Sequence, residues 1–115
     1  PIRSLLSAGG LIIFGSDTPI ASPDLLAGFT AAVFRRGFRG ETLGSTEAIL
    51  PLEAARAYTV DAARSIGWDH CSGMIRVGFH ADFTIFDRNP LKVDPATEIY
   101  GTIKSGKWTS KRTTV

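Results

Sequence analysis

The sequence has 115 residues, of which 43% are hydrophobic and 21% are charged, as is typical of a soluble globular domain with a real core. Its net charge of +2 is too small to indicate nucleic acid or an anionic membrane as a partner, and no apolar run reaches the roughly 20 residues that span a bilayer. The single cysteine, Cys71, excludes an internal disulfide framework and a cysteine-based zinc motif, and it fits a cytoplasmic location.

The first part of the sequence, residues 1–67, has the pattern of an α/β protein. A short helical segment ends at Gly9-Gly10, and the continuous apolar run LIIF follows it. Apolar, β-branched residues without alternation indicate a strand that is buried on both faces, as in a parallel sheet covered by helices. We therefore predict a strand over residues 11–15.

Two helical stretches are predicted after this strand. Ser22 and Pro23 are typical of an N-cap and a first helical position, and apolar residues at three- and four-residue spacing extend this helix over about 23–36. A second stretch covers about 51–66, where Thr59 is a possible cap between two helices. The side of this stretch that we predict to be buried carries Leu52, Ala55 and Tyr58, with Ala54 as a further candidate.

The second part, residues 68–115, has the pattern of short β-strands. The segment ADFTIFD largely alternates between apolar and polar residues, and Ser105-Gly106 is typical of a tight hairpin turn. Asp82, which comes just before the first of these strands, is predicted to fix a turn. The chain is thus predicted to combine an α/β part with a β part.

Asp17 follows the predicted strand directly, in the stretch GSDTP. In a parallel sheet the loops at the carboxyl ends of the strands converge on one crevice, where a carboxylate can bind a metal or take a proton from a bound water. The position is equally typical of a turn residue whose side chain bonds its own backbone, so the local pattern leaves both interpretations open. Ser16 and Thr18 are predicted to be turn formers or hydrogen-bond partners within the site, because no general base lies near them in the sequence.

A second set of possible metal ligands is Asp69-His70-Cys71. Adjacent residues cannot easily share one ion, and no second cluster completes a tetrahedral site, so we interpret this stretch as a loop. His80 stands alone before the β part and is interpreted as an exposed residue.

Three segments in this order resemble the C-terminal part of the amidohydrolase superfamily, and in particular the branch that contains N-substituted formamide deformylases. They are GSDTPIASPDLLAGFTAAVFRR, PLEAARAYTVDAARSIG and SGMIRVGFHADFTIFDRNPL. The most specific element is the G-x-x-A-D-F-x-x-x-D pattern, formed here by Gly78, Ala81, Asp82, Phe83 and Asp87.

The resemblance covers about residues 4–108 and implies a (β/α)8 barrel with a small β-sandwich. Residues 1–67 would supply the last αβα elements of the barrel, with 11–15 as its eighth strand, and residues 68–115 would supply strands of the sandwich. A barrel of this type needs roughly 200 or more residues. The chain also begins at Pro1 rather than at methionine. We therefore expect it to be a C-terminal piece of a longer enzyme.

The same resemblance implies a divalent metal, usually zinc, and hydrolysis of a non-peptide C–N bond in a small amide-type molecule. Asp17 would be a metal ligand and the catalytic base, with Ser16 and Thr18 as supporting or substrate-loop residues. The other metal ligands of the family, a His-x-His pair, a bridging Lys or carboxylate and two further His, have no counterpart in this sequence. We therefore expect the 115-residue chain alone to bind zinc poorly and to be inactive.

Two alternatives remain open at this point. The chain could be a non-catalytic α+β domain that binds a partner or forms a homo-oligomer through the unpaired edges of the strand over 11–15. It could also belong to a hydrolase of cyclic imides, ureas or amino-purines, because the substrate-binding loops are not in this sequence.

Overall fold

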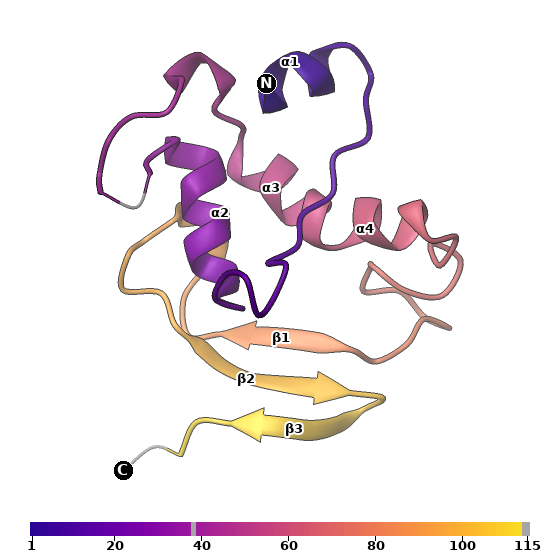
Figure 1. Ribbon diagram of the computed structural model, residues 1–115. Coiled ribbons are helices and arrows are strands. Elements are labelled where there is room, and N and C mark those ends of the chain that lie inside the picture. Colours follow the sequence, from indigo (N-terminus) through magenta and orange to yellow (C-terminus); the bar gives the residue numbers. More distant parts are fainter. Residues whose placement is uncertain (38, 114–115) are drawn as a thin grey trace.

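The computed structural model describes residues 1–37 and 39–113, which form a group of helices beside a small sheet (Figure 1). In chain order the elements are α1 (Ile2–Ser7), α2 (Leu25–Phe34), the 3-10 turn η1 (Ser45–Glu47), α3 (Pro51–Tyr58), α4 (Val60–Ser65), β1 (Phe83–Phe86), the 3-10 turn η2 (Pro90–Lys92), β2 (Ile99–Lys104) and β3 (Lys107–Lys111). None of the helices in these two ranges is long and apolar enough to cross a membrane.

The predicted strand over residues 11–15 is not formed. The segment is extended, but it has no partner strand in the described ranges, and Leu11 and Ile13 are 48% and 50% exposed. Its one backbone hydrogen bond across the fold runs from the Phe14 amide to the carbonyl of Ala57, a helical residue. A strand is stabilised by a ladder of bonds to a neighbouring strand. This apolar run packs on helices along one side only, so the burial on both faces that we predicted is absent.

Helix α2 begins at Leu25 rather than at Pro23, because Asp24 is its N-cap instead of Ser22. One carboxylate oxygen of Asp24 accepts hydrogen bonds from the amides of Leu26 and Ala27, at 2.9 and 3.3 Å. Both Ser and Asp are good N-caps, and only the backbone conformation decides which side chain reaches the free amides of the first turn. The predicted helix is therefore present but shorter.

Helices α3 and α4 occupy the predicted stretch 51–66, with a break at Thr59. The hydroxyl of Thr59 donates to the carbonyl of Ala55 at 2.7 Å and does not cap α4. The predicted buried side is confirmed at Ala54 and wrong at Leu52, which is 61% exposed, and Ala57 is buried although it was not predicted to be. Alanine carries little periodic signal in a sequence, yet its small side chain lets α3 pack closely against α2. The main core cluster consists of Phe29, Ala32, Ile49 and Ala54.

The β part forms one antiparallel sheet in the order β1-β2-β3. Ser105 and Gly106 join β2 to β3 and both have positive φ, 50° and 76°, as a two-residue type I′ hairpin turn requires. The carboxylate of Asp82 accepts a hydrogen bond from the Ser105 amide at 2.7 Å and pairs with Lys104, so the predicted role of Asp82 in a turn is confirmed. A sandwich needs two sheets, and the described part of the chain contains one.

Candidate functional site

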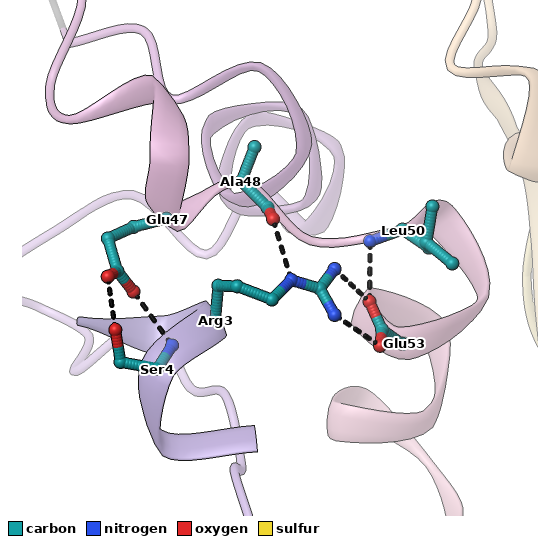
Figure 2. Close-up of polar contacts among 6 residues, drawn as sticks. All are labelled: Arg3, Ser4, Glu47, Ala48, Leu50 and Glu53. Carbon is teal, nitrogen blue, oxygen red and sulfur yellow. Dashed lines mark hydrogen bonds and ion pairs between the residues drawn. The ribbon is translucent and has the colours of Figure 1, made fainter. Parts of the chain in front are cut away.

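Helix α1 precedes the segment that leads to Asp17 and fixes the start of that segment. Figure 2 shows the Arg3 guanidinium donating to both carboxylate oxygens of Glu53, at 2.8 and 2.6 Å, and to the Ala48 carbonyl at 3.2 Å. Glu53 also accepts from the Leu50 amide at the start of α3. The hydrogen bond from Arg3 lowers the pKa of Glu53, and the same bond raises the pKa of Arg3.

A second contact joins α1 to η1. The carboxylate of Glu47 accepts from the Ser4 amide at 3.0 Å and from the Ser4 hydroxyl (Figure 2), and these bonds lower the pKa of Glu47. The sequence gives no signal for these pairs, because the partners are 43 and 50 residues apart along the chain. Together they hold α1 against the beginning of α3.

The middle of the segment is held by Phe14. Its amide donates to the Ala57 carbonyl at 3.1 Å, and its ring packs edge-on against Tyr58 with 5.3 Å between the ring centroids. Tyr58 in turn lies so close to α2 that a Cβ built on Gly28 would be 2.3 Å from its hydroxyl oxygen. The segment is thus fixed to α3 three residues before Asp17, by a contact that sequence analysis did not identify.

Asp17 lies in a tight turn after this segment. Its φ is 54°, in the left-handed region, and its carbonyl accepts a hydrogen bond from the Ile20 amide at 2.8 Å. The hydroxyls of Ser16 and Thr18 lie 2.7 Å apart, and the Thr18 hydroxyl also donates to the Ala21 carbonyl at 3.3 Å. The side chain of Asp17 is exposed, and none of the hydrogen bonds found among the described residues involves its carboxylate. The three predicted site residues are therefore brought together as one turn.

The remaining candidate residues do not join this turn. Asp69, His70 and Cys71 lie in a loop after α4, as interpreted from the sequence, and the His80 amide donates to the Cys71 carbonyl at 2.8 Å. Within residues 1–37 and 39–113, no group of three or more His, Cys, Asp and Glu side chains could hold a metal ion. Asp17 does not line either of two clefts of about 430 and 520 Å³, which lie beside α3 and beside α2.

The two aspartates of the G-x-x-A-D-F-x-x-x-D pattern have structural contacts. Asp82 holds the hairpin turn, and Asp87 exchanges two hydrogen bonds with the backbone of Glu98, at 2.8 and 3.0 Å. The pattern that carries the resemblance most strongly therefore organises the sheet.

Residues 1–109 match the amidohydrolase family. The chain belongs to this family. This amidohydrolase chain is 34% identical over 112 residues to the putative amidohydrolase YtcJ of Bacillus subtilis (strain 168), and the match covers 91% of the chain and 21% of that protein. It is 35% identical over 97 residues to the N-substituted formamide deformylase of Arthrobacter pascens, with 84% and 18% covered. The resemblance found in the sequence is confirmed.

A shorter match of 66 residues, at 33% identity, links the amidohydrolase chain to the imidazolonepropionase of Vibrio campbellii (strain ATCC BAA-1116), covering 54% of the chain and 16% of that protein. The chain thus spans about a fifth of the length of the Bacillus subtilis and Arthrobacter pascens relatives. Among solved structures, an amidohydrolase from Thermotoga maritima MSB8 is similar, with a TM-score of 0.71 over 96% of this chain and 26% of that chain. Their identity is 21%, so this likeness shows the fold.

Proposed function

We propose that this chain is the C-terminal part of a metal-dependent amidohydrolase that cleaves a non-peptide C–N bond in a small amide-type substrate. The observation that carries the proposal is the family match over residues 1–109. The turn at Asp17 supports it, because that turn presents to solvent a carboxylate that has no hydrogen-bond partner among residues 1–37 and 39–113. The name of the Arthrobacter pascens relative points to an amide-type bond for the substrate class.

The metal expected for this family is zinc, and the described residues do not fit a complete site for it. A structural or catalytic zinc site needs at least three protein ligands. Asp17 is one carboxylate, and no group of three candidate ligands occurs in the described ranges. The other ligands would have to come from outside this chain.

The chemistry proposed for Asp17 itself is proton transfer. Its carboxylate accepts a proton from the water that attacks the amide carbonyl carbon, and it later delivers a proton to the nitrogen of the leaving amine. Both steps need an oxygen that is free to receive and release a proton within hydrogen-bond reach of the substrate. The exposure of Asp17 and the absence of a partner for its carboxylate among the described residues agree with that requirement.

The test uses the protein encoded by the whole natural reading frame that contains this chain. We expect it to hydrolyse at least one of a panel of N-substituted formamides and cyclic amides, with bound zinc detected by elemental analysis. Asp17→Asn is expected to lower kcat by about 10²- to 10⁴-fold, the usual contribution of a general acid–base group.

The matched control is Asp24→Asn, which removes the same charge seven residues along the chain. Asn caps a helix about as well as Asp, so this variant should keep its stability and its activity within about twofold. Full activity in Asp17→Asn, or no amide hydrolysis by the zinc-loaded protein with any substrate of the panel, would contradict the proposal.

A further inference from the structure

We propose that the hydroxyls of Ser16 and Thr18 are positioning groups, which hold the backbone of Asp17 in its left-handed conformation and keep its carboxylate free. This inference rests on the proposed function of Asp17. Ser16 and Thr18 act through Asp17, and both belong to one series of hydrogen bonds.

The conformation of Asp17 needs such support. A φ of 54° is disfavoured for a residue that carries a Cβ, although Asp tolerates it better than most residues. The bond from the Ile20 amide to the Asp17 carbonyl closes the turn from one side, at 2.8 Å. The contact between the Ser16 and Thr18 hydroxyls is a second link within the turn, because these two residues directly flank Asp17.

Thr18 makes both hydroxyl contacts in this turn. Its hydroxyl lies 3.3 Å from the Ala21 carbonyl, to which it can only donate. In its 2.7 Å contact with Ser16, either hydroxyl can be the donor. These hydrogen bonds link Ser16, Thr18 and the Ala21 carbonyl in series, so Thr18 is the central member of the series.

The consequence for Asp17 is that the contacts of both neighbouring hydroxyls are with each other and with the Ala21 carbonyl. Neither flanking side chain donates to the Asp17 carboxylate, which stays exposed to solvent and to a substrate. If the contacts of Thr18 were removed, the turn could relax and the backbone that carries the Asp17 side chain would shift. A displacement of about 1 Å at a reacting group can reduce a rate about 100-fold.

The experiment measures kcat and KM of Thr18→Val, Thr18→Ser and Ser16→Ala in the whole natural protein. Thr18→Val keeps the shape and removes both hydrogen bonds, so we expect kcat to fall about tenfold or more, in the range found for groups that orient reacting side chains. Ser16→Ala removes one bond and should cause a smaller loss. Thr18→Ser keeps the hydroxyl and should restore kcat to near the unmodified value, while KM changes by less than about twofold in all three.

The control is Ser22→Ala, because the Ser22 hydroxyl lies in the same loop but accepts from the Asp24 amide, outside the turn. A crystal structure of Thr18→Val should show φ of Asp17 leaving the left-handed region. Unchanged kcat in Thr18→Val, or a loss that Thr18→Ser fails to restore, would overturn the inference. If Thr18→Val does not fold, Ser16→Ala decides by the same comparison with Ser22→Ala.

The failure of this inference can be told apart from failure of the proposed function. An inactive Asp17→Asn with a fully active Thr18→Val would remove the positioning role alone. An active Asp17→Asn would remove the proposed function itself.

Discussion

Thr97 lies in the turn before β2, and among the described residues it is the polar residue that is buried, with 5% of its surface exposed. Its hydroxyl oxygen has no hydrogen-bond partner in the part of the chain that the structure describes. A buried hydroxyl without a partner costs about 1–3 kcal/mol relative to its state in water. This residue therefore reduces the stability of the fold.

Thr97→Val replaces that hydroxyl by a methyl group of nearly the same size. We expect the free energy of unfolding to rise by about 1 kcal/mol, because the penalty disappears and the packing is kept. Chemical denaturation of the two proteins measures the difference. Thr59→Val is the control, since the Thr59 hydroxyl does have a partner, the Ala55 carbonyl, and the same change there should give no gain. A loss of stability in Thr97→Val would show that the hydroxyl is satisfied.

At the scale of an element, helix α2 contains an interior glycine, a residue with low helix propensity. Gly28 lies inside the helix, where alanine is more favourable by about 1 kcal/mol. Tertiary packing explains the glycine, because a Cβ at this position would lie 2.3 Å from the Tyr58 hydroxyl oxygen and 3.6 Å from the ring carbon that bears it. The close approach lets Tyr58 contact α2 and Phe14 together.

Gly28→Ala is therefore expected to destabilise the chain by about 1 kcal/mol, since overpacking of a well-packed site costs about 1–3 kcal/mol and exceeds the helix gain. Tyr58→Phe removes the clashing oxygen and leaves the 3.6 Å contact, which is ordinary van der Waals packing. Adding Gly28→Ala to Tyr58→Phe should then stabilise by about 0.5–1 kcal/mol. A double-mutant cycle measured by thermal unfolding checks this change of sign. Additive effects would mean that Tyr58 moves aside freely.

At the scale of the whole molecule, several contacts that connect distant parts of the chain involve charged side chains. Arg3 with Glu53 joins α1 to α3, Ser4 with Glu47 joins α1 to η1, and Asp82 joins the start of β1 to the hairpin. The pKa values of Glu53, Glu47 and Asp82 are lowered, in each case mainly by a side-chain hydrogen bond. The stability of the fold therefore depends on pH through these three carboxylates.

A lowered pKa in the folded state gives stability that is present above the unfolded pKa and is lost as the pH falls through the folded pKa. Unfolded Asp and Glu titrate near about 3.9 and 4.3. We therefore expect a constant melting temperature between about pH 6 and 8 and a decline below about pH 4.3. Glu53→Gln should lower the melting temperature at pH 7 and make the acid decline shallower.

Asp69→Asn is the control for that series, because the Asp69 side chain is 43% exposed and lies 3.8 Å from Arg64, a contact of little energetic weight. It should leave both the melting temperature and the acid slope unchanged. Equal acid slopes in Glu53→Gln and the unmodified chain would show that Glu53 does not contribute to the pH dependence.

Much of the local structure of this protein is predictable from the sequence, because caps and turns depend on residues only a few positions apart. The hairpin at Ser105-Gly106, the role of Asp82 and the approximate range of α3 and α4 are all of this kind. The family was also predictable, since its patterns are contiguous stretches of the chain.

Other features were decided only by the tertiary structure. A strand over residues 11–15 needs a partner strand, and the described residues offer a helix instead. Arg3 and Glu53 are 50 residues apart, so no local pattern links them. The sequence by itself determined which residues stand at the candidate site, Ser16, Asp17 and Thr18. Only the fold decided that the two hydroxyls bond to each other and leave the carboxylate free, because that depends on the backbone angle at Asp17.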